Sequence, residues 1–589
     1  MCGIFGYVGK RSDAAKIILG GLKRLEYRGY DSWGVAVLEN RQIKASKKVG
    51  AIGDLDKDLQ LPDSFIGIGH TRWATHGGVT DINAHPHYAS DKSFVLAQNG
   101  MVDNFEELKS KLLKKGYKFE TETDTEVIVR LIEDASRGNL QEAVRAAFLK
   151  LKGRNTIILL TKDGEIIACR NGSPLVLGKN KKGEFFFSSD THSFSDVAQS
   201  VLVVENGQMV VGKNSKISLF DIKSAKNLDF HFEKIEFLAE TAEKEGFSHF
   251  MTKEIFESSE VIRVIIAKEK QTHLDFAKEI KAAKRVFTIG SGTAGAAAAQ
   301  IAYFLRAVAK INAVSLVGAD AFEYFDLFGA GDLIIAPSQS GETADVLEVL
   351  EIAKKKGVKI ASLVNMPGSM MTKISDFAFM AGAGPEICVM STKVFTSQIA
   401  WGYLIACAVS GKYEVGRTNL EKLAKKIDNY LKNENNHKDL KNLAEKLSKK
   451  EHIFLLAKAQ NFQIIREGMV KIIEASYKHA HAIPAGDLKH YAITLMEKGV
   501  PVLVLVSNDE VKDDVISAVS QVRVRGAQVV GFAPFEHKDF DLFVKIPDLG
   551  EVSSIMNTIS LQLLAYYMAV KLGNNVDYPR NIAKSVTVK

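Results

Sequence analysis

Two patterns of apolar and polar residues follow one another along this chain, and the change falls near residue 275. In the first part, short apolar runs such as SFIGIGHTRW and SFVLAQNGMV end in polar turns that contain glycine, which is typical of β-strands. The segments NTIILLTKDGEIIACR and VLVVENGQMVVGK predict β-hairpins, because Asp163-Gly164 and Asn206-Gly207 tolerate the positive φ angles of tight turns. The segments AAKIILGGLKRL and DNFEELKSKLLKKG predict helices. An α+β domain is therefore expected over residues 1–235.

From residue 275 onward, apolar strands alternate with helices, which indicates a parallel sheet. The alternation occurs twice, since RVFTIGSG from residue 285 is similar to HIFLLAKA from residue 452. Equivalent positions lie 169 residues apart in the pairs Ser338 and Ser507, and Ile360 and Val529. We therefore expect two similar α/β domains in tandem, at residues 275–415 and 446–575.

Charged segments separate these domains. Residues 236–274 have no strand signal and are expected to form a linker. Residues 416–445 belong to a stretch rich in lysine and glutamate, which predicts a helical connector with a solvated face. Residues 576–589 form a basic tail, and such chain ends are usually poorly ordered.

Composition narrows the class of protein only slightly. The 589 residues are 46% hydrophobic and 25% charged, as in ordinary globular proteins, and the net charge of +7 is spread over 77 basic and 70 acidic residues. This mild bias does not indicate nucleic-acid binding. The four cysteines form no C-x-x-C pair, and the chain has neither a signal peptide pattern nor an apolar run of about 18 residues. A cytoplasmic protein of a reducing compartment is expected.

Glycines and hydroxyl groups mark two strand ends of the first α/β domain. Gly290, Gly292 and Gly295 have the G-x-G-x-x-G spacing of a dinucleotide site, although any parallel domain favours glycine at its first turn. In APSQSGETADV, helix-end amides and several polar side chains predict a phosphate cradle, and the alternative is an ordinary helix cap. The loop VSNDEV of the second domain lacks this glycine and threonine and adds acids, so only the first domain is expected to bind phosphate. The cradle residues are Ser338, Gln339, Ser340 and Thr343.

One helix of the second domain carries a row of charges. Glu467, Lys471 and Glu474 lie at positions i, i+4 and i+7 of IIREGMVKIIEASYKHA and therefore share a face. The simpler interpretation is an exposed helix with ion pairs, and the functional one is an acid, a base and a cation aligned for proton transfer. His490 in a loop and Lys584 in the tail are each, taken alone, more typical of structural positions.

The first domain has candidate residues at its strand ends and at its start. The loop HTRWATHGG holds four of them, AQNGMVDN holds two more, and TETDTEVI holds one at a helix start, although each could be a turn or a cap. Cys2 alone would be read as a small apolar residue that starts a strand. His70, His76, His85 and His87 match no zinc template, so no metal site is expected. The candidates are Arg72, Trp73, Thr75, His76, Asn99, Gly100 and Asp124.

Together these motifs resemble a known family. MCGIFGYVG, RLEYRGYDS, HTRWATHG, NAHPH, NG and TDTEV are similar to the class II glutamine amidotransferase domain. SQSGETADV, STKVFTSQ, EGMVKIIEASYKHAHAIPAGDLKH and PRNIAKSVTV are similar to paired sugar-isomerase (SIS) domains. Their order and spacing over nearly the whole chain resemble the glutamine–fructose-6-phosphate aminotransferases, also called glucosamine-6-phosphate synthases.

The resemblance implies a fold and a reaction. It implies an N-terminal-nucleophile domain, with antiparallel sheets between helix layers, followed by two parallel-sheet SIS domains. It implies that glutamine and fructose-6-phosphate give glucosamine-6-phosphate and glutamate, the first step of hexosamine synthesis towards UDP-N-acetylglucosamine. It implies a homodimer with no cofactor, metal, nucleic-acid or membrane partner.

The resemblance also implies roles in the glutaminase half. After removal of Met1, the Cys2 thiol would attack glutamine with its own α-amine as proton acceptor. Asn99 and the Gly100 N–H would form the oxyanion hole. Arg72 and Asp124 would hold the glutamine carboxylate and ammonium, with Thr75 and His76 in the same pocket. Trp73 and the C-terminal tail would guard an internal path for ammonia.

In the sugar half, the resemblance places the phosphate on the cradle residues of APSQSGETADV. His490 of the neighbouring subunit would open the sugar ring, and Lys584 would form an imine with the open-chain ketone. Glu474 would move a proton between carbons 1 and 2, assisted by Lys471 and Glu467. Further sugar contacts would come from Thr293, Val389, Ser391 and Ala583.

The sequence departs from the family pattern at several positions. Ala294 stands where the family usually has serine in Cys-Gly-Thr-Ser, and Gln98 stands where a histidine commonly precedes Asn-Gly. Two other functions stay open, the first because of Ala294 and of a linker that also departs from the family pattern, the second because of the G-x-G-x-x-G spacing. One is a catalytically weak regulator that binds sugar phosphates on this scaffold, and the other is an NAD-dependent enzyme that uses the glycine-rich turn.

Overall fold

A computed structural model of the chain describes residues 2–53, 60–194, 196–234 and 244–586. The chain divides into two compact units, residues 1–241 with 583–589, and residues 242–582. Across the described ranges, every helix is too short or too polar to cross a membrane.

The first unit is built on two antiparallel sheets. The eight-stranded sheet contains β1 (Gly3–Val8), β2 (Ser32–Glu39), β3 (Gln42–Val49), β4 (Ile66–Arg72), β9 (Val176–Lys179), β10 (Phe185–Ser188), β11 (Ser200–Val203) and β15 (Glu233–Lys234). Its order is β15-β11-β9-β10-β1-β4-β2-β3. The seven-stranded sheet contains β5 (His87–Tyr88), β6 (Phe94–Gly100), β7 (Asn155–Thr161), β8 (Glu165–Asn171), β12 (Gln208–Lys213), β13 (Lys216–Asp221) and β14 (Asn227–Leu228). Its order is β14-β13-β12-β8-β7-β6-β5.

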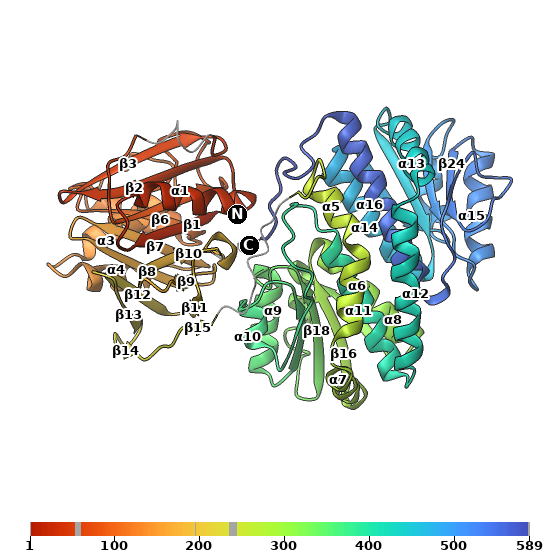
Figure 1. Cartoon of the computed structure of the whole chain (residues 1–589), viewed down its shortest axis with the longest axis horizontal. Coiled ribbons are helices and arrows are strands. Elements are labelled where there is room, and N and C mark those ends of the chain that lie inside the picture. The colour runs from red at the N-terminus through yellow and green to blue at the C-terminus, as the bar shows by residue number, and fades with distance from the viewer. Residues whose placement is uncertain (1, 54–59, 195, 235–243, 587–589) are drawn as a thin grey trace. The chain divides into compact units, whose positions relative to one another are not determined.

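Helices cover the outer faces of these sheets, which gives four layers (Figure 1). The two-residue period of β1 shows the arrangement, because Ile4 and Val8 pack between the sheets whereas Phe5 and Tyr7 pack under a helix. The expected antiparallel sheets between helix layers are therefore confirmed. The helices are α1 (Ala14–Leu25) on the eight-stranded sheet, and α2 (Phe105–Lys114), α3 (Asp124–Ala135) and α4 (Leu140–Phe148) on the seven-stranded sheet.

One of the two predicted hairpins forms and the other does not. β7 and β8 pair as an antiparallel hairpin around the turn that contains Gly164. β11 and β12 do not pair, because β11 lies in the eight-stranded sheet beside β9 while β12 lies in the seven-stranded sheet between β8 and β13. The prediction of a hairpin around Asn206-Gly207 is wrong. The turn residues specify a reversal of the chain, with Gly207 at φ 80°, but not the strand partner.

The second unit contains two parallel sheets of five strands each. The first has the order β17-β16-β18-β19-β20 and consists of β16 (Arg285–Gly290), β17 (Ala313–Val317), β18 (Asp332–Ser338), β19 (Lys359–Val364) and β20 (Phe377–Met380). The second has the order β22-β21-β23-β24-β25 and consists of β21 (His452–Ala457), β22 (His479–Pro484), β23 (Pro501–Leu505), β24 (Gln528–Ala533) and β25 (Leu542–Lys545). The orders are equivalent, so the internal duplication is confirmed. In this topology a ligand crevice is expected where the first and third strands end, because the chain order reverses there.

Helices cover both sheets (Figure 1), and those between the sheets share one continuous core, whereas α9 (Ala344–Lys355), α10 (Met370–Ile374) and α15 (Lys512–Val524) pack in two separate cores. Four of them carry the candidate residues or border them, namely α8 after β16, α9 after β18, α11 before the second domain, and α14 after β21. The helices are α8 (Gly292–Ala307), α9 (Ala344–Lys355), α10 (Met370–Ile374), α11 (Lys393–Val409), α14 (Phe462–Ser476), α15 (Lys512–Val524) and α16 (Ser553–Leu572).

The segments expected to link domains are largely helical. Part of the expected linker, 236–243, lies outside the described residues, but the rest forms α5 (Phe250–Phe256), α6 (Ser258–Ala267) and the start of α7 (Lys270–Ala282). These helices differ from a solvated linker because Met251, Ile255 and Ile262 are fully buried in the core of the second unit. The connector forms α12 (Tyr413–Leu431) and α13 (Glu434–Leu447), whose charged faces are exposed and whose leucines are buried.

Candidate active site

Cys2 lies at the start of β1, where strand pairing places it beside the end of β4. Its Sγ accepts a hydrogen bond from the Trp73 N–H at 3.3 Å, and the Arg28 Nε donates to the Cys2 carbonyl at 3.3 Å. The Gly3–Thr71 pairing of β1 and β4 brings Arg72 to the same edge of the sheet. Burial raises the pKa of the Cys2 thiol, and the neighbouring Arg72 charge opposes that rise. The thiol therefore needs a local proton acceptor to react as a thiolate.

Asn99 and Gly100 end β6, and the conformation of Gly100 is one that only glycine permits. Gly100 has φ 133°, and a Cβ at this position would lie 2.0 Å from the Arg154 carbonyl oxygen. Asn99 is buried, and its Nδ2 donates to the Ser189 Oγ at 2.7 Å. An amide side chain and a main-chain N–H at the end of one strand are the donors that an oxyanion hole requires.

Arg72 organises the loop that follows β4. Its guanidinium donates to the carbonyl oxygens of His76 at 2.5 Å, Gly77 at 3.1 Å and Gly78 at 3.0 Å. These contacts use three of its five N–H groups, so it holds the loop and retains donors for a carboxylate. In this loop Thr75 is exposed and His76 is half-buried, with its ring 5.5 Å from that of Phe105.

Asp124 lies in the first turn of α3, where helix-end amides favour a carboxylate. Its Oδ2 accepts from the Val102 N–H at 2.8 Å, which ties α3 to the chain two residues after Gly100. Burial raises the pKa of Asp124, and the Val102 N–H opposes the rise. Hydrogen bonds and strand register thus place Asp124, Cys2 and Arg72 within one network of loops in the first unit.

Two residues that the sequence analysis missed support this network. Arg28 is buried, holds the Cys2 carbonyl, and pairs with Asp190 at 3.4 Å. The Ser189 Oγ accepts hydrogen bonds from both the Asn99 Nδ2 and the Ile4 N–H. Arg28 belongs to the motif RLEYRGYDS, so a signal was present, whereas Ser189 lies in no motif used above.

The charged row of α14 is mostly buried, with Glu474 half-buried at its end, so its interpretation as an exposed ion-pair face is wrong. Glu467 and Lys471 are 1% and 0% exposed. The Lys471 Nζ lies 3.4 Å from the Glu467 Oε1 and 2.5 Å from the Glu474 Oε2, and it donates to the Thr293 Oγ1 at 3.0 Å. The face is buried because α14 packs against α8 and α16. Burial raises the pKa of Glu467 to about 7, despite the opposing Lys471 charge.

The polar loop after β18 has the geometry of an anion cradle. Gly341 has φ 65°, and its amide donates to the Ser338 Oγ at 2.9 Å, while the Glu342 amide donates to the Ser340 Oγ at 3.2 Å. Thr343 is the N-cap residue of α9, yet its side chain makes no capping hydrogen bond. Gln339 is half-buried beside these hydroxyls. This favours the phosphate interpretation over the helix cap.

The loop that precedes α11 is held by buried carboxylates. The Glu386 Oε1 accepts from the Thr392 and Val394 amides and from the Ser391 Oγ. The Val389 N–H donates to the Asp577 carbonyl at 2.9 Å, which joins this loop to the start of the tail. Val389 and Ser391 are therefore positioned by a rigid support within the second unit.

The remaining candidates are His490, Ala583 and Lys584. His490 is exposed, and no hydrogen-bond partner of its imidazole occurs within the described ranges. Ala583 and Lys584 group with the first unit. Their roles stay predictions.

Layered antiparallel sheets that start with a cysteine, followed by a duplicated parallel sheet with a hydroxyl-lined loop, define a glutamine amidotransferase joined to sugar-isomerase domains. The family model of the glutamine amidotransferase domain matches residues 70–196, and that of the SIS domain matches residues 279–408 and 446–572. The chain belongs to the family of isomerizing glutamine–fructose-6-phosphate aminotransferases. It is 38% identical to those of Thermococcus kodakarensis and Aquifex aeolicus, over 100% of both chains in each comparison.

Solved structures agree with the fold of the two parallel-sheet domains. The C-terminal domain of glucosamine-fructose-6-phosphate aminotransferase from Francisella tularensis matches with 31% identity and a TM-score of 0.50, covering 57% of this chain and 100% of that one. Tagatose-6-phosphate ketose/aldose isomerase from Escherichia coli matches with 17% identity and a TM-score of 0.50, covering 57% and 96%, and shares the fold.

Proposed function

We propose that the protein transfers the amide nitrogen of glutamine to fructose-6-phosphate and isomerises the sugar, which yields glutamate and glucosamine-6-phosphate. The observation that carries the proposal is the row of Glu467, Lys471 and Glu474 beside Thr293, in which a buried lysine lies between a buried and a half-buried glutamate. Buried charges cost stability, so such a row is expected where it performs chemistry. The reaction would be the first step of hexosamine synthesis towards UDP-N-acetylglucosamine.

In the glutaminase half, the Cys2 thiolate attacks the side-chain amide carbon of glutamine. After removal of Met1, the Cys2 α-amine accepts the thiol proton, since such amines have a pKa of about 7.7–8.0. Asn99 and the Gly100 N–H stabilise the oxyanion, ammonia leaves, and water releases glutamate from the thioester. Arg72 and Asp124 bind the carboxylate and ammonium of glutamine, with Thr75 and His76 beside them. Trp73 and the tail keep the ammonia from water.

In the sugar half, the cradle of Ser338, Gln339, Ser340 and Thr343 binds the phosphate. Lys584 forms an imine with the ketone and releases water, and ammonia then displaces the lysine amine. Glu474 moves a proton from carbon 1 to carbon 2, which converts the ketose imine into the amino aldose. Glu467 and Lys471 hold Glu474 in place by the contacts described above. The sugar also contacts Thr293, Val389, Ser391 and Ala583.

We infer that the enzyme is a homodimer, because His490 would then reach the sugar of a second copy. Its exposure supports this, as does the exposure of the apolar neighbours Tyr491 and Leu495, which are 47% and 58% exposed. The four cysteines are free thiols, which fits a cytoplasmic location.

We also propose the domain boundaries suggested by the sequence, with one change. Residues 1–235 form the amidotransferase domain, 275–415 and 446–575 the SIS domains, 416–445 the helical connector, and 576–589 the catalytic tail. Because α5 and α6 are buried in the second unit, the linker of 236–274 is reduced to its first part.

The test is direct. The purified chain is incubated with glutamine and fructose-6-phosphate, and glutamate and hexosamine phosphate are measured together with the intact mass. We expect both products in equal amounts from protein that lacks Met1. Protein with a processed N-terminus that forms no hexosamine phosphate would overturn the proposal.

A further inference from the structure

Gln98 occupies an unusual place in the seven-stranded sheet. It is buried in β6 directly before Asn99, and β5 is too short to pair with it, since β5 ends its pairing at His87 and Leu96. Continuing this antiparallel register places Gln98 opposite His85. Imidazoles replace the missing strand, because the Gln98 N–H donates to the His85 Nδ1 at 3.3 Å and the Gln98 carbonyl contacts the His70 Nε2 at 2.9 Å.

These contacts determine the tautomer of His85. Its Nδ1 accepts from a main-chain amide and therefore carries no proton, so a neutral ring has its proton on Nε2. Burial lowers the pKa of His85 well below its usual range, with His70 and His87 adding to the effect. The His85 Nε2–H then donates to the Thr125 Oγ1, 3.1 Å away.

The Gln98 side chain completes this series of hydrogen bonds. The Thr125 hydroxyl donates to the Gln98 Oε1 at 2.6 Å, and the Gln98 Nε2 donates to the Asn155 Oδ1 at 2.6 Å. A closed ring therefore runs from the Gln98 N–H through His85 and Thr125 back to the Gln98 amide. Each donor in it faces an acceptor, and the ring is buried, so the loss of one member leaves the others unpaired.

The ring joins the two sides of the glutamine site. Gln98 precedes Asn99, the proposed oxyanion donor, and Thr125 follows Asp124, the proposed ammonium ligand. We propose that Gln98 is a positioning residue whose side chain, through Thr125 and His85, fixes Asn99 relative to Asp124 during glutamine hydrolysis. This inference rests on the proposed glutaminase function.

The test compares three variants of the full-length enzyme. Gln98→Met removes both amide contacts with little change in volume, and Thr125→Val removes the hydroxyl. We expect each to reduce kcat/KM for glutamine about 10- to 100-fold, with a lower kcat and a higher KM in both. The double variant should cost no more than the worse single one, because either change opens the same ring.

Two further variants are controls. Thr125→Ser keeps the hydroxyl and should restore activity to within about threefold of the wild type. Thr161→Val removes another buried threonine hydroxyl, at the far end of β7, where it accepts from the Glu165 amide, and should leave both constants unchanged. If Gln98→Met lowered only kcat and Thr125→Val raised only KM, with additive effects, the two residues would act separately and the ring proposal would be overturned.

A spectroscopic readout separates this inference from the proposed function. Selective ¹⁵N-histidine labelling should show the Nε2–H tautomer for His85 in the wild type, and a changed His85 signal in Gln98→Met and Thr125→Val but not in Thr161→Val. An Nδ1–H tautomer in the wild type would overturn the ring whatever the activity. Wild-type protein that shows the Nε2–H tautomer and hydrolyses no glutamine would overturn the proposed function and leave the ring intact, without a role in glutamine hydrolysis.

Discussion

The two parallel-sheet domains have the same strand order and opposite chemistry at equivalent places. In the first domain, the loop after β18 places the Ser338 and Ser340 hydroxyls beside the main-chain amides of Gly341 and Glu342. In the second, Ser507 of the equivalent loop after β23 is bonded to side chains from outside the loop. The Asn461 Nδ2 donates to the Ser507 Oγ at 2.8 Å, and the Asn557 Nδ2 donates to the Asn461 Oδ1 at 2.8 Å. Ser507 therefore belongs to a buried network of amide side chains, and we expect the phosphate at the first loop and not at the second.

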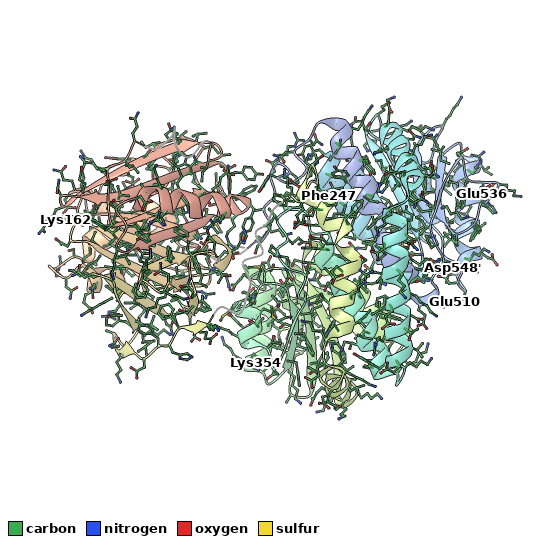
Figure 2. The ribbon with its side chains drawn as sticks, in the orientation of Figure 1. Lys162, Phe247, Lys354, Glu510, Glu536 and Asp548 are labelled. Atoms are coloured by element: carbon green, nitrogen blue, oxygen red, sulfur yellow. The ribbon has the colours of Figure 1, made fainter. Side chains whose placement is uncertain are left out.

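The two loops also differ in charge. The second loop carries Asp509 and Glu510, and Asp548 lies close enough to Asp509 to act on it; Glu510 and Asp548 are labelled in Figure 2. Burial raises the pKa of Asp509, and the nearby Glu510 and Asp548 charges add to the rise. Such a loop repels an anion.

In the helices that follow the first strand of each domain, the charged groups lie in the second copy and not in the first. α8 begins with Gly292, Thr293 and further small residues, whereas the equivalent α14 carries Glu467, Lys471 and Glu474. The two helices pack together, and Lys471 bonds Thr293 across them. The duplication thus supplies one site from two halves: the first copy supplies the anion cradle and the second supplies the acid–base groups.

The largest loss of activity is expected from a substitution in the second parallel-sheet domain. Glu474→Gln should lower the formation of hexosamine phosphate about 10²- to 10⁴-fold, because it removes the proposed acid–base group, while glutamine hydrolysis and fructose-6-phosphate binding persist. Product and glutamate are assayed in parallel. Glu445→Gln, which removes an exposed carboxylate on α13, is the matched control and should be silent. A decrease of less than about tenfold would remove Glu474 from the proposed role.

A paired substitution tests the division of labour. Ser338→Ala should weaken fructose-6-phosphate binding about 10- to 100-fold, since a hydrogen bond to a charged group is lost. Ser507→Ala, at the equivalent position of the second copy, should leave the affinity unchanged. Isothermal titration calorimetry measures both. Equal losses from the two substitutions would contradict the comparison.

The buried row should also make stability depend on pH. Burial raises the pKa of Glu467 to about 7 from its usual 4.5. Between these two pH values the folded chain keeps a proton on this carboxyl, whereas the unfolded chain has released it. The stability from this group is complete below about pH 4.5 and falls as the pH rises towards 7, by up to ~1.4 kcal/mol per pH unit. Glu467→Gln should remove this loss of stability. The difference between the melting temperatures at pH 8 and pH 5 should therefore be more favourable in Glu467→Gln than in the wild type, by about 2–4 °C for each kcal/mol of unfolding free energy regained.

Thermal unfolding followed from pH 4 to 8 checks this dependence. The exposed Glu421→Gln on α12 should keep the wild-type profile. If the stabilities of the wild type and of Glu467→Gln changed in parallel through this pH range, the Glu467 carboxyl would not retain its proton in the folded chain.

The smallest effect concerns Thr343. Because its side chain does not cap α9, Thr343→Val should change the free energy of unfolding by less than about 0.5 kcal/mol while weakening sugar-phosphate binding. Asn433→Ala removes a side chain that does cap α13, by accepting from the Asn435 amide, and should cost about 1 kcal/mol. Chemical denaturation compares the two. A loss of 1 kcal/mol from Thr343→Val would restore the helix-cap interpretation.

Much of the site was predictable because its signals are local. The spacing of Glu467, Lys471 and Glu474 already placed them on one helical face, and the hydroxyls around Gly341 already indicated an anion. The sequence could not show whether that face was exposed, since α8 and α16 cover it from distant parts of the chain. Arg28 and Ser189 were missed for the same reason, as each acts on a residue far away in sequence.

The sequence by itself determined the kinds of elements, the duplication of the parallel domain and most residues of the proposed chemistry. These depend on periodicity, turn residues and spacing, which act over a few positions. Only the tertiary structure decided that β11 and β12 enter different sheets, that a lysine between two glutamates is buried, and that Gln98 closes a ring through His85 and Thr125. Strand pairing, burial and hydrogen-bond partners depend on which distant surfaces meet, and no local pattern encodes that choice.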